Sequence, residues 1–147
     1  MYKNVSFSDD DSIIDPPVHD AKILGMLVTS QKKLIISMQL VDGSNVCLVL
    51  NDIKRIRSDG FREGNIVLDI TIWKGDEVDL KKIAYVHGLE TFYPLDSSSY
   101  IQQAMHDFLH EERLLVQIEP SYGCKLACIC GGIHYLQDYS LEAILTL

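Results

Sequence analysis

Residues 22–50 consist of short apolar segments separated by polar turns. Apolar and polar residues alternate in much of 22–50, and the polar residues 30–33 divide the first apolar segment from the second. Asp42 and Gly43 separate the second segment from 45–50, and an Asp-Gly pair supplies the positive φ angles that a tight hairpin needs. The pattern therefore predicts three strands joined by two turns.

A fourth strand is predicted at 66–73, after a turn at 62–65. Alternation places two sets of side chains on opposite faces of this strand: Ile66, Leu68, Ile70 and Ile72 on one, and Val67, Asp69, Thr71 and Trp73 on the other. One face is expected to pack on the core while the other is partly in water, as antiparallel sheets allow.

Two helices follow from a period of 3.6 residues. Asp79 is placed to cap the first, and Gly88 stands where a left-handed residue ends it. The second is expected to begin at Ser99, with Gln102 in the capping-box position, and to run to about Glu112.

The remaining pattern predicts a hairpin. Residues 114–119 form a strand that Pro120 is expected to end, 121–123 form a turn, and 125–135 form the second strand. Residues 141–147 suit either a short helix or an edge strand. We therefore predict an α+β fold, in which a mostly antiparallel sheet of five to seven strands has two helices inserted before a C-terminal β-hairpin.

The beginning of the chain differs in composition from the rest. Residues 1–18 contain three successive aspartates and the pair Pro16-Pro17, which interrupts both helices and strands. We predict an acidic N-terminal arm over 1–18 and a single α+β domain over 19–147, since 147 residues suit one domain.

The net charge of the chain limits the classes of molecule that it is expected to bind. The chain has 13 basic and 21 acidic residues, a formal net charge of −8. This charge disfavours nucleic-acid binding and favours encounter with a basic protein. No apolar run is long enough to span a membrane, and the first residues lack a signal peptide's apolar segment, so we expect a cytoplasmic protein. The candidate partner-binding residues are Asp9, Asp10, Asp11, Asp20, Glu111 and Glu112.

The cysteines allow two interpretations. Cys124, Cys128 and Cys130 have the same parity on the predicted strand, so their thiols share one face. Same-face residues lie about 6.6 Å apart along a strand, which is far for ligands of one metal ion, and free cysteine is commonly buried. We expect core thiols rather than disulfides. The alternative is a metal or small-molecule site that adds His134 as a ligand.

No catalytic residue or cofactor is predicted. His106 and His110 resemble a zinc-binding helix, but helical spacing places them opposite the apolar stripe, on the solvent face. His87 falls on the apolar stripe of its helix and is expected to cap the helix end. His19 and Asp20 are adjacent on a predicted strand entrance, where their side chains should diverge. Glycine-rich phosphate-binding motifs are absent from the sequence.

The order of these features resembles a group of small bacterial proteins. The features are residues 19–21 (His-Asp-Ala), the Asp42-Gly43 turn, the segments 53–56 and 66–72, and the sequence Ile-Glu-Pro-Ser-Tyr-Gly at 118–123. They resemble small bacterial α+β proteins of the polymorphic-toxin immunity type, over most of residues 19–135. The resemblance implies a cytoplasmic binding protein without catalysis, whose partner is a basic toxin domain.

Three functional hypotheses follow. The first is a small non-enzymatic protein-interaction domain, such as an immunity protein that neutralises a basic toxin. The second is a metal- or small-molecule-binding domain that uses the cysteine strand. The third is a homodimeric scaffold domain, because an exposed apolar strand face can be covered by a second copy.

Overall fold

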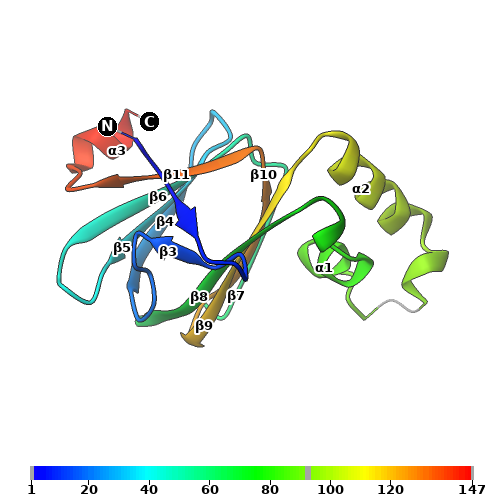
Figure 1. Cartoon of the computed structure of the whole chain (residues 1–147), viewed down its shortest axis with the longest axis horizontal. Helices are drawn as coiled ribbons and strands as arrows, with labels where there is room; N and C mark the ends of the chain where they lie inside the picture. The colour runs from blue at the N-terminus through cyan, green and yellow to red at the C-terminus, as the bar shows by residue number, and fades with distance from the viewer. Residues whose placement is uncertain (1, 92–93, 147) are drawn as a thin grey trace.

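A large antiparallel sheet is the main element of the fold (Figure 1), and the computed structural model describes residues 2–91 and 94–146. Nine strands pair in the order β1-β11-β6-β5-β4-β8-β9-β10-β7, and β2 pairs with β3 separately. The strands are β1 (Lys3–Asn4), β2 (Ser6–Phe7), β3 (Ile13–Asp15), β4 (Lys22–Val28), β5 (Leu34–Gln39), β6 (Asn45–Asn51), β7 (Arg55–Asp59), β8 (Asn65–Lys74), β9 (Leu114–Tyr122), β10 (Lys125–Cys130) and β11 (Gly132–Gln137). The helices are α1 (Leu80–Val86), α2 (Ser99–His110) and α3 (Leu141–Leu145), with short 3-10 turns at Gly75–Glu77 and Leu95–Ser97.

The sheet curls round and closes on itself. β6 and β7 are successive segments of one bent strand, separated by residues 52–54, and β10 and β11 are segments of another, separated by Gly131. β6 pairs with β11, and β7 pairs with β10. Two hydrogen bonds of 2.8 Å continue the pairing across the bend, from Lys54 N to the Ile129 carbonyl and from Gly131 N to the Asn51 carbonyl. The strand made of β10 and β11 therefore pairs with β9 on one side and with the strand made of β6 and β7 on the other, so the sheet is closed.

Alternating side chains divide the core into three layers. The largest layer fills the interior of the closed sheet and includes Ile36, Met38, Leu48, Ile118 and Leu126. A second layer lies between the outer face of β9 and β10 and the helices α1 and α2, which sit together on one side of the sheet (Figure 1). A third, smaller layer lies on the outer face of β5, β6 and β11, where α3 packs. The interior of the closed sheet is thus packed with apolar side chains.

The predicted helices are confirmed. Asp79 caps α1 by accepting a hydrogen bond from Lys82 N at 2.9 Å, and Gly88 ends the segment with φ of 73°. The cap of α2 is Ser98, one residue before the predicted start, and its hydroxyl accepts from Ile101 N. Both helices are inserted between β8 and β9. The last described residues form the short helix α3 rather than an edge strand.

The α+β class and the large antiparallel sheet are confirmed, but the strands are more numerous than predicted. The nine strands exceed the expected five to seven because the segment predicted as one strand over 125–135 bends at Gly131 into β10 and β11. The residues around 53–56, left without a type by the pattern, contribute β7. The N-terminal residues add β1 to the same sheet.

The N-terminal residues are folded against the sheet, where the sequence predicted an arm before a domain starting at residue 19. β1 pairs with β11, Ser12 bridges to Thr71, and the Ile72 amide donates to the Asp11 carbonyl at 3.0 Å. Ile13 and Val18 are buried in the interior layer. Burial of these two apolar side chains outweighs the acidic composition on which the prediction rested. Met1 and Leu147, the outer ends of the two predicted units, lie outside the described residues.

Two β-bulges overturn the simple alternation predicted for 66–73. The register between β8 and β9 shifts on both sides of Val67, so Leu68 has no partner residue and is 43% exposed while Val67 is fully buried. A bulge also explains why β9 continues past Pro120, which was expected to end it. A proline is tolerated where the ladder is already interrupted.

Among the described residues, no helix combines the length and the apolar character needed to cross a membrane.

Two glycines with positive φ provide a test of the turn between β9 and β10. A Cβ at Gly123 (φ 86°) would lie 2.5 Å from Asn65 Oδ1 and 2.9 Å from the Gly64 carbonyl oxygen, whereas a Cβ at Gly43 (φ 88°) would meet nothing within 4 Å. Asn65 is buried, and its Oδ1 accepts from the Arg62 and Cys124 amides. We expect Gly123→Ala to lower the free energy of unfolding by about 2 kcal/mol more than Gly43→Ala, which incurs only the left-handed backbone cost. Urea unfolding measures both, and equal losses would contradict the close packing.

Candidate functional site

The helical insertion, defined as residues 75–113 between β8 and β9, carries most of the net charge. It contains eight acidic and three basic residues, a net charge of −5 out of −8. Three of the acids are in ion pairs: Asp79 with Lys82, Glu90 with Arg57, and Glu111 with both Lys54 and Arg113. The other five have no ion-pair partner among the described residues: Asp76, Glu77, Asp96, Asp107 and Glu112.

Two arginines anchor the insertion to the closed sheet. Arg57 of β7 donates to the Tyr85 carbonyl at 2.8 Å and to Glu90 at 2.7 Å. Arg113 is only 11% exposed, and its Nη1 donates to the Asp52 carbonyl oxygen at 3.0 Å and to the Asp52 carboxylate at 2.5 Å. Its hydrogen bond holds the pKa of Asp52 below the ordinary value. The middle of the insertion, at the end of α1, is therefore fixed to β7, and its C-terminal end is fixed to the bend that closes the sheet.

One side of the C-terminal end of α2 forms a cleft of about 560 Å³, which we call the acidic cleft. Asp76 and Glu77 reach it from the 3-10 turn after β8, and Glu112 reaches it from the end of α2. The side chain of Leu109 lines the same cleft and is 44% exposed. Lys74 and Arg113 line it as well, and Glu77 accepts a hydrogen bond from Lys74 N at 3.1 Å. The cleft thus combines three carboxylates and two cations with accessible apolar surface.

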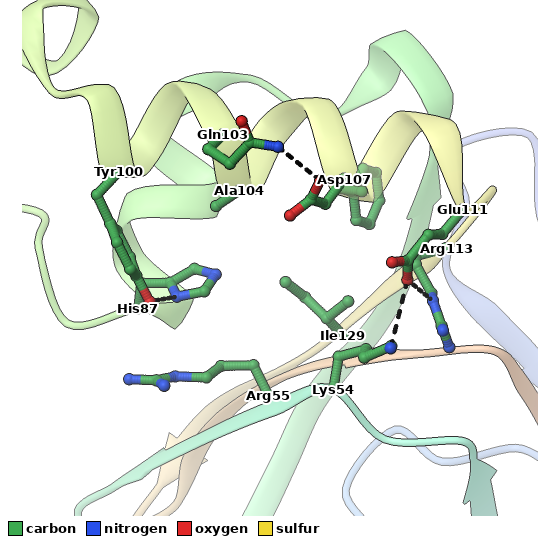
Figure 2. A pocket seen from close by; sticks show the side chains of 11 residues that line it. Lys54, Arg55, His87, Tyr100, Gln103, Ala104, Asp107, Glu111, Arg113 and Ile129 are labelled. Atoms are coloured by element: carbon green, nitrogen blue, oxygen red, sulfur yellow. Dashed lines mark hydrogen bonds and ion pairs between the residues drawn. The ribbon is translucent and has the colours of Figure 1, made fainter.

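The other side of α2 forms a smaller cavity of about 270 Å³, which we call the α2 pocket (Figure 2). Side chains from four regions meet there: the bend before β7 with the first residue of β7, the end of α1, α2 with the residues that follow it, and β10. They are Lys54, Arg55, His87, Tyr100, Gln103, Ala104, Asp107, Phe108, Glu111, Arg113 and Ile129.

His87 closes one end of the α2 pocket. Its Nδ1 lies 3.2 Å from the Tyr100 hydroxyl, and the two rings meet edge to face with centroids 5.4 Å apart. Burial lowers the pKa of His87 below the ordinary value of 6.5, and the nearby cation of Arg55 lowers it further. His87 occupies the C-terminal cap position of α1, but its backbone amide makes the bonds to the helix carbonyls, and its ring contacts Tyr100 instead of capping the helix as expected. Its contact with Tyr100 was not apparent from the sequence, because it depends on how the two helices pack.

The acidic candidates from the sequence are dispersed over the molecule. Glu111 lines the α2 pocket and Glu112 the acidic cleft, although the two are adjacent in the chain. Asp9, Asp10 and Asp11 lie in the loop between β2 and β3, where Asp10 accepts a hydrogen bond from Ser8. Asp20 lies in the turn before β4. Asp9, Asp10, Asp11 and Asp20 line neither the α2 pocket nor the acidic cleft.

For the remaining histidines, the structure confirms some of the predicted side-chain positions and contradicts others. His106 and His110 are exposed on α2, which confirms their predicted place on its solvent face. His19 and Asp20 do not diverge: their side chains meet at 3.0 Å, and both are exposed. The reason is the positive φ of Asp20 (61°), which replaces the extended geometry on which the prediction depended.

The cysteines and His134 lie on different faces. Cys124, Cys128 and Cys130 are buried in the interior layer, which confirms the prediction of core thiols, whereas Cys47 is buried in the layer beneath α3. His134 follows the bend at Gly131, and its ring stacks edge to face on Tyr2. Among the described residues, no group of three or more His, Cys, Asp or Glu side chains is arranged to hold a metal ion.

Several residues of both clefts were missed as candidates. Asp76, Glu77, Arg55 and Tyr100 carry no motif, and their grouping arises only when the insertion folds back on the sheet. One signal was accessible, because the acidic residues are concentrated in 75–113.

Comparisons with models of known families, with curated proteins and with solved structures find no significant match for this chain. The function is therefore inferred from its residues and their geometry.

The buried thiols give a direct prediction. Burial raises the pKa of Cys47 to about 11 and also raises the pKa of Cys124, and the Cys130 thiol together with burial raises the pKa of Cys128. Because the thiolate is the reactive form of these three thiols and the Cys130 side chain is fully buried, we expect all four cysteines to react with a thiol-specific reagent only after unfolding in urea. Elemental analysis of the folded protein is the companion measurement, and a tightly held equivalent of zinc would contradict the assignment to the core.

The pKa of His87 is open to a second test. Removal of the Arg55 cation by Arg55→Gln is expected to raise the pKa of His87 in an NMR titration, while burial still holds it below 6.5. Because the folded pKa is lower than the unfolded value, the unfolded chain binds this proton more readily. The stability that His87 contributes is therefore present above about pH 6.5 and is lost as the pH falls. Lys81→Gln is the control, and an equal change in both variants would contradict the role of Arg55.

Proposed function

We propose that the protein is a non-enzymatic binding protein that docks a basic segment of a protein partner in its acidic cleft. The observation that carries this proposal is the grouping of Asp76, Glu77 and Glu112 in one cleft with the exposed side chain of Leu109. Lys74 and Arg113 also line this cleft, but none of the three carboxylates has an ion-pair partner among the described residues. Carboxylates left without cations in the folded chain are free to pair with cations from outside.

The chemistry of the cleft favours lysine and arginine side chains. Their apolar stems pack along apolar surface while the charged ends remain at a polar rim. Leu109 provides such surface, and the three carboxylates provide the rim. Protein interfaces commonly have this arrangement of an apolar centre within polar surroundings.

The class of partner that we propose is a basic toxin domain, and the protein would act in the cytoplasm as the corresponding immunity protein. The resemblance to bacterial immunity proteins supports this choice, as does the net charge of −8, which attracts a basic domain over a distance and raises the rate of association. Inhibition would follow from occlusion of the toxin's active site by the acidic surface.

Neutralisation of the acidic cleft tests this proposal. The variant Asp76→Asn/Glu77→Gln/Glu112→Gln removes three charges and keeps side-chain shape. The matched control Glu63→Gln/Asp138→Asn/Glu142→Gln removes three exposed charges elsewhere. In affinity capture from lysate of the source organism, a basic protein should be retained by the wild type and the control, released by high salt, and lost with the cleft variant.

Titration of the purified partner then measures the effect. We expect the cleft variant to bind about tenfold more weakly than the control, since each exposed charge pair contributes a few tenths of a kcal/mol or more. A partner that binds both variants equally, or whose binding is independent of salt, would contradict docking in the acidic cleft.

A further inference from the structure

Strand β4 has one edge that is open over most of its length. β5 pairs with β4 from Lys22 to Val28, but β8 pairs with the other edge only at Lys22 and Ile23. From Gly25 to Val28, no strand in the described part of the chain covers that other edge. An open strand edge presents backbone N–H and C=O groups that can pair with a further strand.

The turn after β4 identifies the residues whose backbone groups face this open edge. Thr29 N donates to the Lys33 carbonyl at 2.9 Å, so the backbone groups of Thr29 face the β5 side. In an antiparallel pair, successive residues direct their backbone groups to alternate sides. The backbone groups of Leu27 therefore also face β5, while those of Met26 and Val28 point to the open edge.

The side chains along this edge are apolar and accessible. Leu24, Leu27 and Val28 are 57%, 42% and 59% exposed. The nine residues 23–31 include neither a charged residue nor a proline, although 23% of the chain is charged. Exposed strand edges are commonly guarded by charged side chains or by proline. The open edge of β4 lacks both of these guards, and covering its apolar side chains would be favourable.

A second copy of this chain complements the open edge. When two copies of β4 run antiparallel about a two-fold axis at Leu27, Met26 of each copy lies opposite Val28 of the other. Both residues direct N–H and C=O groups to the contact, so the two copies can exchange backbone hydrogen bonds. The two Leu27 side chains then face each other at the axis, where the residue pair has no hydrogen bonds and side chains come closest. A strand with charged side chains would find no counter-charge within 23–31.

The acidic insertion does not oppose this contact. It carries −5 of the net charge of −8, and Figure 1 shows α1 and α2 at one end of the molecule, with β4 and β5 toward the other. Salt at 0.1 M screens exposed charges beyond about 10 Å. Two copies that meet along uncharged strands therefore keep their main acidic surfaces apart.

We propose that the chain forms a two-fold symmetric homodimer, in which the open edges of two β4 strands pair antiparallel and join the two sheets. Reciprocal backbone hydrogen bonds between Met26 and Val28 and the contact of the two Leu27 side chains form the centre of the interface. No residue of β4 lines the acidic cleft, so each copy in the dimer presents its own cleft.

The first experiment measures molecular mass against protein concentration. In sedimentation equilibrium from about 1 to about 500 μM, the mass should rise from that of the monomer toward that of the dimer, because association follows mass action. A single monomeric species over the whole range would overturn the proposal.

Amide hydrogen exchange then distinguishes edge pairing from a contact between faces. In the dimer, the Met26 and Val28 amides should exchange at least about tenfold more slowly than in dilute monomer, because they become hydrogen-bonded. The Gly25 and Leu27 amides already face β5 and should change much less. Equal slowing of all these amides, or slowing only when another protein is added, would overturn pairing of two copies through this edge.

Substitutions at the two-fold axis test the contact most specifically. Leu27→Lys and Leu27→Asp each place like charges opposite one another, and each should weaken dimerisation about tenfold or more. An equimolar mixture of the two variants should associate again, because opposite charges then meet at the axis. Val41→Lys and Val41→Asp are the matched controls, since Val41 is 74% exposed and lies in the turn between β5 and β6.

The outcomes separate this proposal from its failure. Loss of the dimer in each Leu27 variant, recovery in the mixture and intact controls support pairing at the β4 edge. A dimer that is unaffected by both Leu27 variants, or a mixture that stays monomeric, would overturn it. The acidic-cleft variant Asp76→Asn/Glu77→Gln/Glu112→Gln should dimerise as the wild type does, and the Leu27 variants should retain the basic partner, so the two proposals fail independently.

Discussion

Closure of the sheet at the paired bends is the constraint on which the rest of the structure depends. The hydrogen bonds between Lys54 and Ile129 and between Gly131 and Asn51 keep two bent strands in register. Without this pairing, the interior layer would lose an enclosing wall, since β7 and β11 would no longer be joined around it. The bend also decides where the functional surface forms, because Lys54 and Arg55 follow it directly and enter the α2 pocket.

Arg113 connects the closure to the helical insertion. A Cβ on Gly131 would lie 3.2 Å from Asp52 Cβ and 3.3 Å from Arg113 Nη1, so the bend is tightly surrounded. Arg113 holds Asp52 on the bend and Glu111 at the end of α2. One buried guanidinium therefore sets the distance between α2 and the sheet, and with it the width of the α2 pocket.

Glu111 and Glu112 are adjacent in the chain at the end of α2, but they lie on different surfaces. Glu112 has a positive φ of 52°, so the chain leaves the helical path there, and Arg113 N bonds back to the Phe108 carbonyl. Glu111 consequently lies in the α2 pocket, compensated by two cations, while Glu112 lies in the acidic cleft and has no ion-pair partner in the described part of the chain. Arginines thus neutralise the acids at the base of the insertion, and the acids that remain available are those on its outer surfaces.

The sequence by itself determined those features that depend on residues close together in the chain. The helix cap at Asp79, the start of α2 at Ser99, the Asp42-Gly43 turn and the burial of the cysteine face follow from local hydrogen bonding and periodicity. Only the tertiary structure decided the closed sheet, the bulge at Leu68, the burial of Ile13 and the assembly of both clefts. These features join residues far apart in the chain, and local patterns do not specify them, because a bulge or bend of one residue reverses which face a side chain takes.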